Sequence, residues 1–391
     1  MKEITKQDNC TGCTACINIC PQNCLTMKSD SQGFLYPMLQ YPEKCIECNL
    51  CAKVCPLNKK QTHILSEELT EAYAAYSLDD GLRKGSSSGG IFSEIAQMVI
   101  QTGGAVYGAA YGQDFRISHI CVENFAELEK LRGAKYAQSD LTSVFPEIKE
   151  RLKTGQQVLF SGTPCQIEGL KSYLRKDYEN LLSIDIVCHG VPSPAAWEQY
   201  VFYRASKDCN GKLPERINLR SKVTGWSRYR YSNVYDYPGG KRYVQWGGED
   251  LYMKLFVRDY INRKSCEICQ FKGFQRASDI TLGDFWGIWD EIPEMDDDKG
   301  TSLVLLHSQK GKLYFQALDK KISYKKVTLE QAVAQNPSIL HSSLAKPERD
   351  AVLASILIGD FDTAVKPLLT SSKKSNFLTW LKTKMKRIFR R

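Results

Sequence analysis

The sequence predicts an α+β protein. A small cysteine-rich domain comes first, an α/β body with a mixed sheet follows, and a helical region ends the fold. Three observations predict this order. One cysteine motif occurs twice in the first sixty residues; strand-like apolar runs then alternate with helical segments; residues 326–370 have a helical pattern. A chain of 391 residues is long enough for two or three domains.

The N-terminal domain, residues 1–60, is predicted from the repeated motif C-x2-C-x2-C-x3-C. Each copy is followed by a proline, Pro21 or Pro56, and the copies are 35 residues apart. This is the pattern of a two-cluster bacterial ferredoxin, in which the fourth cysteine of each copy binds the other 4Fe–4S cluster. The first cluster is therefore assigned to Cys10, Cys13, Cys16 and Cys55, and the second to Cys45, Cys48, Cys51 and Cys20. A pair of zinc knuckles is the alternative, although zinc sites usually have longer gaps between cysteine pairs.

Composition indicates a cytoplasmic redox protein. The chain has 15 cysteines, no secretion signal at its start and no apolar run of roughly 18 residues, so the thiols are expected to be reduced and to bind metal. The net charge is +9, but residues 371–391 carry +8 of it. The remaining chain is near neutral, which argues against nucleic acid as a partner and against a nucleic-acid-binding redox sensor.

The first part of the body, residues 71–155, begins with a strand in "EAYAAYS". A Ser/Gly loop, "SSSGG" at 86–90, leads into a helix whose apolar residues recur at helical spacing, and "AVYGAAY" is the next strand. Glycines and the free N–H groups of a helix N-terminus suit a phosphate. A serine-capped helix start is the alternative for this loop.

The second part, residues 156–325, places cysteines after strands. Val158–Phe160 is predicted as a buried strand, Ser161–Cys165 as a turn and Gln166 onward as a helix. A second strand ends at Val187, Cys188 and His189 form a turn, and a helix begins near Ala195. If the strands are parallel neighbours, both cysteines emerge at the ligand-binding edge of the sheet.

A third 4Fe–4S cluster is predicted from four cysteines of the body. Cys266 and Cys269 form a CxxC pair that would complete a set of four thiolates with Cys165 and Cys188. A structural zinc uses the same ligands. A nucleophile and base formed by Cys188 and His189 is the remaining alternative, although adjacent residues rarely face each other.

An antiparallel hairpin is predicted between Arg216 and Trp246, with "YPGGK" as its turn. Tyr229, Tyr231, Tyr235 and Tyr237 keep a period of two and are expected on one face. The hairpin would cover a flat cofactor or would be simply half-exposed.

Five separated segments resemble the beta subunit family of coenzyme F-420-reducing hydrogenase and dehydrogenase. They are "SSSGGIFSEI", "LRGAKYAQS", "FSGTPCQIEGL", "VCHGVPSP" and "CEICQFKGFQRASDITLGDFWGIW", and they span roughly residues 72 to 320. The resemblance implies FAD beside a 4Fe–4S cluster, in a reductase that passes electrons between clusters and a flavin-like, deazaflavin or other organic acceptor. The FAD neighbours it implies are Ser87, Ser88, Gly89, Gly90, Lys135, Tyr136, Thr163, Asp284 and Trp286. His189 and Lys135 are the candidate catalytic groups, as proton donors or partners of the flavin.

Ferredoxin or another redox protein is the expected electron donor, and a small organic molecule the expected acceptor. The alternative is a relay subunit at the inner membrane face with no substrate of its own. It rests on the tail 371–391, where apolar residues share one stripe of a basic helix typical of membrane interfaces. A solubilising tail or a helix that docks on a partner fits the same residues.

Overall fold

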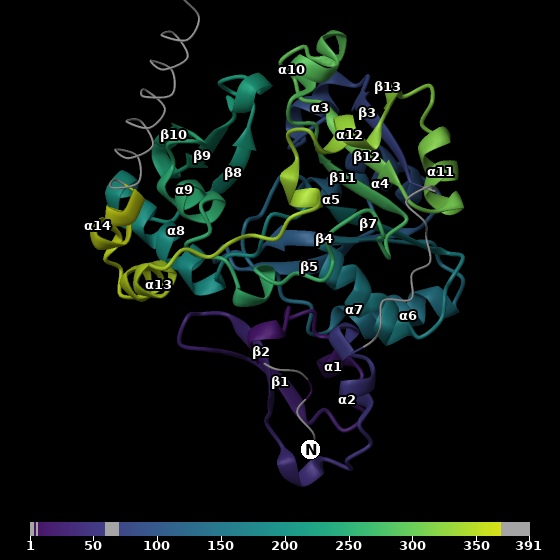
Figure 1. Ribbon diagram of the computed structural model, residues 1–391, viewed down its shortest axis with the longest axis vertical. Helices are drawn as coiled ribbons and strands as arrows, with labels where there is room; N and C mark the ends of the chain where they lie inside the picture. Colours follow the sequence, from purple (N-terminus) through teal and green to yellow (C-terminus); the bar gives the residue numbers. More distant parts are fainter. Residues whose placement is uncertain (1–3, 5–6, 59–69, 369–391) are drawn as a thin grey trace, which may run out of the picture.

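The N-terminal domain is a small lobe below the body. In the computed structural model, residues 4, 7–58 and 70–368 are described (Figure 1). The hairpin of the N-terminal domain pairs β1 (Leu25–Ser29) with β2 (Leu35–Leu39). Its two short helices are α1 (Ala15–Asn18) and α2 (Leu50–Lys53). Each helix contains one cysteine of the repeated motif, Cys16 or Cys51, so the repeat in sequence is a repeat in structure.

An eight-stranded mixed sheet forms the centre of the body. In sheet order its strands are β13 (Ile322–Val327), β3 (Glu71–Ser77), β12 (Ser302–Leu306), β11 (Ile280–Asp284), β7 (Leu181–Ile186), β6 (Val158–Gly162), β4 (Ala105–Tyr111) and β5 (Ile117–Val122). The four strands β11, β7, β6 and β4 are mutually parallel, and the others pair antiparallel. The predicted mixed sheet is confirmed, as is the parallel pairing of the two strands that precede Cys165 and Cys188.

Helices cover both faces of this sheet because its central strands are apolar on both sides. On one face pack α4 (Ile91–Gln101), α5 (Phe125–Leu128) and α11 (Gln309–Gln316). On the other lie α6 (Val144–Lys153), α7 (Pro164–Leu174), α10 (Ile288–Glu291) and α12 (Leu329–Val333). The short helix α3 (Asp80–Gly85) joins β3 to the Ser/Gly loop. In β4, Val106 faces the first layer and Tyr107 the second.

A second, three-stranded sheet packs beside the body. Its strands are β8 (Arg216–Ser221), β9 (Ser232–Asp236) and β10 (Arg242–Trp246), and its helical neighbours are α8 (Pro194–Cys209), α9 (Leu251–Val257), α13 (Arg349–Leu357) and α14 (Phe361–Ala364). The "YPGGK" turn joins β9 to β10 as predicted. The region predicted to be helical, residues 326–370, contains α12, α13 and α14 in its described part. Residues 340 to 348 form no helix.

The expectation that four tyrosines share one strand face is wrong for Tyr229. Arg228 and Tyr229 have positive φ angles of 54° and 64°, so the chain turns there and β9 begins only at Ser232. Tyr229 is 40% exposed, whereas Tyr235 is fully buried. Strand periodicity therefore does not extend across this turn.

The two domains are joined by packing and by Arg263. Ala15 and Val54 of the N-terminal domain belong to the same apolar cluster as α6 and α7. The buried guanidinium of Arg263 hydrogen-bonds to residues of both domains, described below. No helix of the described residues is long and apolar enough to cross a membrane, and the predicted basic tail, 371–391, lies outside the described residues.

Candidate functional site

Two cavities in the N-terminal domain are lined by the cysteines of the repeated motif, four in each. The proximal cavity, nearer the body, has about 370 Å³ of space and is lined by Cys10, Cys13, Cys16 and Cys55. The distal cavity has about 410 Å³ and is lined by Cys20, Cys45, Cys48 and Cys51. This grouping matches the exchange of the fourth cysteine that the motif predicts. Cys24 also lines the distal cavity, where its backbone N–H donates to the Cys20 sulfur at 3.4 Å.

A third cavity, the body cavity, lies at the carboxyl edge of the parallel strands. It has about 470 Å³ of space, and its lining includes Cys165, Cys188, Cys266 and Cys269. Cys165 follows β6 and Cys188 follows β7, so adjacent parallel strands deliver both thiols to one place. Contrary to the expectation of a turn, Cys165 lies in the first turn of α7. The helix begins before Cys165 because Thr163 and Gln166 form a capping box, in which Thr163 N–H donates to Gln166 Oε1 at 2.9 Å.

The four thiols of the body cavity are half-buried. Burial raises the pKa of Cys165, Cys188 and Cys266 to about 12 each. Arg263 opposes this shift at Cys165 and Cys266, while Lys272 opposes it at Cys188. The Thr163 hydroxyl lies 3.1 Å from the Cys165 sulfur, and Thr163 is the N-cap residue of α7.

Three cations line the same cavity. Arg263 donates to Cys10 O (2.6 Å), Leu35 O (3.0 Å) and Gln138 Oε1 (2.9 Å). Lys272 Nζ donates to Cys188 O (2.6 Å) and Ser338 O (2.8 Å). All these acceptors are neutral. The third cation, Arg276, lies 3.5 Å from the buried carboxylate of Asp185.

His189 also lines the body cavity, but it faces away from the adjacent thiol. Its Nε2 lies 2.8 Å from Asp259 Oδ1, and its Nδ1 lies 3.3 Å from the Ser338 hydroxyl. Both ring nitrogens thus have partners other than Cys188, which argues against a nucleophile and base pair. In the described part of the chain, no three His, Cys, Asp or Glu side chains converge on the position of one metal ion.

A second cluster of side chains lies at the end of the neighbouring strand β11. The arginine–aromatic cluster comprises Arg220, Asp284, Trp226, Tyr231 and Trp286. Arg220 pairs with Asp284 at 2.5 Å, and its guanidinium carbon lies 3.9–4.8 Å from the three ring centroids. The two indoles are nearly parallel, at 12°. Burial raises the pKa of Asp284, and Arg220 opposes that shift.

The Ser/Gly loop packs against this cluster through Lys222. Lys222 Nζ donates to the carbonyls of Arg83 and Ser88, each at 2.6 Å, and burial lowers its pKa to about 7. Within the loop, Gly89 N–H donates to Ser302 Oγ at 2.9 Å, and a Cβ on Gly89 would lie 2.4 Å from a carbonyl of β3. Gly90, with φ of +92°, caps α4. Glycine is therefore required here by the sheet as well as by any ligand.

Lys135 and Tyr136 are adjacent in sequence but have different surroundings. The ammonium of Lys135 donates to the carbonyls of Lys130, Arg132 and Gly133, and burial lowers its pKa to about 7. The Tyr136 hydroxyl lies 3.4 Å from Arg220.

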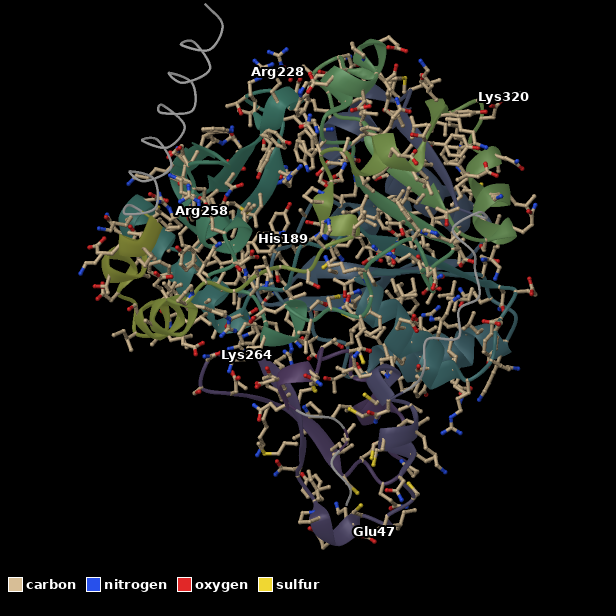
Figure 2. The ribbon with its side chains drawn as sticks, in the orientation of Figure 1. Glu47, His189, Arg228, Arg258, Lys264 and Lys320 are labelled. Carbon is tan, nitrogen blue, oxygen red and sulfur yellow. The ribbon has the colours of Figure 1, made fainter. Side chains whose placement is uncertain are left out.

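Phe256 packs between the two sites. Its ring centroid is 5.0 Å from that of Tyr136 and 5.2 Å from that of His189. A chain of side chains thus connects the body cavity to the arginine–aromatic cluster. Figure 2 shows His189 near the centre of the molecule.

Family models match both domains of the chain. The model for "Coenzyme F420 hydrogenase/dehydrogenase, beta subunit N-term" matches residues 72–145, and its C-terminal counterpart matches residues 155–331. Together they cover more than half of the chain. The chain belongs to the coenzyme F420 hydrogenase/dehydrogenase beta subunit family. Residues 9–59 match a 4Fe–4S dicluster domain, so this family member is an iron–sulfur electron-transfer protein.

One matching solved structure is described as a xenon derivative of the F420-reducing [NiFe] hydrogenase complex from Methanosarcina barkeri. The similarity covers 76% of this chain and 91% of that one, with 16% identity and a TM-score of 0.46. None of the curated proteins compared by sequence matches the chain.

Five basic residues of these sites were not identified from the sequence: Arg220, Lys222, Arg263, Lys272 and Arg276. Arg220 and Lys222 alternate at the end of β8, and Arg263 stands three residues before Cys266. Their position near a cysteine or a strand end was the one sequence signal that could have marked them as site residues. It does not show that the side chains are buried, which depends on contacts with residues far away in sequence.

Proposed function

We propose that the chain is an iron–sulfur flavoprotein oxidoreductase. It takes electrons singly from a ferredoxin or similar redox protein, passes them through the N-terminal clusters and a third 4Fe–4S cluster to FAD, and reduces a small organic acceptor. The observation that carries this proposal is the position of the body cavity. Thr11 lines both it and the proximal cavity, while Phe256 connects it to the arginine–aromatic cluster.

The residues of the body cavity fit a third cluster. Its four thiols and its volume are comparable to those of the two ferredoxin cavities, about 470 Å³ against 370 and 410 Å³. Arg263 is 1% exposed and hydrogen-bonds only to neutral oxygens. A buried cation is costly without an anion nearby, and a cluster with four thiolates supplies negative charge. Cys165, Cys188, Cys266 and Cys269 are the proposed ligands.

The arginine–aromatic cluster fits a flat polar ligand such as a flavin. Arg220 Nε and Asp284 Oδ1 are buried without a hydrogen-bond partner among the described residues. Buried polar atoms are normally paired, so a ligand or water is expected there. The nearby indole of Trp286 offers an aromatic surface, and Lys222 with the start of α4 offers positive charge for a phosphate. The proposed FAD neighbours are Ser87–Gly90, Lys135, Tyr136, Thr163, Asp284 and Trp286.

A bound flavin converts between one-electron and two-electron steps. The side chains of this chain would supply binding and charge. Arg220 would present a fixed positive charge, which Asp284 orients. Lys135 and His189 remain the proposed proton-donating groups; the neutral form of Lys135 is accessible near neutral pH because burial lowers its pKa to about 7.

Anaerobic purification followed by iron, sulfide and flavin analysis tests the proposal. We expect about twelve irons and one FAD per chain. Cys188→Ser should lower the iron to about eight, whereas Cys121→Ser, on β5 and outside all three cavities, should leave it unchanged. About eight irons per chain in the unaltered protein would show that the body holds no third cluster. Absence of flavin after gentle purification would remove the flavoprotein assignment.

A relay subunit at a membrane surface is the alternative function. It rests on residues 371–391, outside the described structure. Reduction of free flavin or quinone by reduced ferredoxin, with no other protein present, would favour the enzyme. Pelleting with anionic liposomes only when residues 371–391 are present would favour the membrane contact.

A further inference from the structure

We propose that Lys272 holds the body cluster at a higher reduction potential than both clusters of the N-terminal domain, while Arg263 acts on the body and proximal clusters alike. This inference rests on the proposed function, because it requires a cluster in the body cavity. It adds the order of the cluster potentials and the residue that sets it.

The three cavities lie in series. Thr11 lines both the body and proximal cavities, and Gly169 of α7 packs against Cys13 while Cys165 begins the same helix. The proximal and distal cysteines meet in one apolar cluster, in which Cys16 lies with Cys20. Figure 2 shows the same order: Glu47 at the far tip of the N-terminal domain, Lys264 at the junction and His189 in the body. Each neighbouring pair of sites is thus in contact through shared residues.

Charge differs along this series. The lining of the body cavity includes Arg263, Lys272 and Arg276. Among the described residues, the side chains that line the proximal cavity are uncharged, with Arg263 as the cation that contacts it, through Cys10 O. The charged side chain in the lining of the distal cavity is Glu47. The positive charge of the body cavity therefore decreases step by step toward the tip.

Lys272 is the cation that acts on the body cavity, through its contact with Cys188 O, whereas Arg263 lies between the body and proximal cavities. Arg276 is compensated by the carboxylate of Asp185, and His189 Nε2 lies 2.8 Å from Asp259 Oδ1. Arg263 and Lys272 hydrogen-bond to neutral oxygens. Adding an electron to a cluster makes it more negative, and an uncompensated cation nearby favours that state. In a partly buried site this attraction is only weakly screened by salt.

Transfer along the series involves no bond change. The external donor, a one-electron redox protein, loses one electron, and the distal cluster gains it. Each later transfer oxidises one cluster by one electron and reduces the next by one. The gradient of charge favours every step toward the body.

Potentiometric titration with dithionite, followed by EPR of the intact protein, tests the order of potentials. The signal that disappears in Cys188→Ser belongs to the body cluster. We expect this cluster to be reduced first as the potential is lowered. Lys272→Gln keeps a hydrogen-bond donor but removes the charge, and should shift the reduction equilibrium about tenfold toward the oxidised state, about 59 mV for one electron.

Two controls isolate charge at the cavity. Lys272→Arg should retain the potential, and Lys264→Gln, which replaces a 42% exposed lysine outside the cavity, should not change it. Reduction of the body cluster after either other cluster, or an unchanged potential in Lys272→Gln, would overturn the inference. If Lys272→Gln loses iron, the order in which the clusters of the unaltered protein are reduced still tests the inference. If the proposed function itself is wrong, the unaltered protein should contain about eight irons per chain and show no EPR signal of a body cluster.

Discussion

The Nε–H of Arg263 donates a hydrogen bond of 2.6 Å to the backbone carbonyl of Cys10, which links the body to the first cysteine of the N-terminal domain. The same guanidinium reaches Leu35 on β2 and Gln138 in the body. It also lies 4.0 Å from the ring centroid of Tyr36. One buried side chain therefore fixes the position of the N-terminal domain beside the body cavity.

Replacing Arg263 by methionine should loosen this domain junction. Three acceptors lose a charged donor, so we expect the free energy of unfolding to fall by about 3 kcal/mol. Anaerobic urea titration measures this change, and limited proteolysis should show faster cleavage between the domains. Lys264→Met, an adjacent substitution of a half-exposed lysine, is the control. Equal stability of the two variants would show that Arg263 does not hold the junction.

Gly169→Ala should displace the proximal cluster. Alanine in the middle of a helix normally stabilises it by about 1 kcal/mol relative to glycine. Here a Cβ would lie 2.8 Å from the Cβ of Cys13 and 3.0 Å from its sulfur, so α1 must move. Iron content should fall from about twelve toward about eight per chain. Lys171→Ala on the same helix controls for helix propensity; iron retention in Gly169→Ala would contradict the close packing.

Arg220→Gln should lower the flavin content. The substitution removes the charge that pairs with Asp284 and lies over three aromatic rings. We expect at least a tenfold weaker affinity for FAD, the equivalent of about 1.4 kcal/mol. The ratio of flavin absorbance to protein after gel filtration measures it. Arg216→Gln, on the same strand but 64% exposed, should keep its flavin, and equal loss in both variants would exclude a specific site.

Cys20 and Cys24 both line the distal cavity but should differ in their effect on iron. Cys20→Ala removes a proposed ligand and should cost about four irons per chain. Cys24→Ala should retain them, because its contact with the Cys20 sulfur comes from the backbone N–H, which alanine keeps. Iron and sulfide analysis distinguishes the two. Loss of iron in Cys24→Ala would make Cys24 a ligand.

Acid should destabilise the body through His307. Burial lowers the pKa of His307 to about 3, and the ring bonds to Thr281 (2.8 Å) and Thr70 (3.3 Å). Between about pH 6.5 and pH 3 the unfolded chain binds a proton that the folded chain does not, so stability falls as pH falls. One group contributes about 2 kcal/mol between pH 7 and pH 5.

His307→Gln should therefore show a smaller loss of stability over this pH range in anaerobic urea titrations. The core substitution Phe315→Leu, which carries no titrating group, should lower stability by the same amount at both pH values. Parallel pH dependence of His307→Gln and the unaltered protein would exclude His307 as the acid-sensitive group.

The sequence by itself determined the local features. The spacing of eight cysteines and two prolines predicts both cluster sites of the N-terminal domain, because ligation by three close thiolates is a local property. Apolar periodicity predicts β3, α4, β4, β6 and α7 nearly to their ends. Periodicity failed at Tyr229, where two positive φ angles break the strand without a glycine.

Only the tertiary structure decided which distant groups meet. In the sheet, β7 lies between β6 and β11, and no short stretch of sequence encodes this pairing. The strand order places the four body thiols beside the arginine–aromatic cluster. The burial of Arg263 and Arg220 and the partial burial of Lys272 are likewise results of packing. A basic residue in a sequence is most often solvated, and only long-range contacts remove the water that would screen its charge.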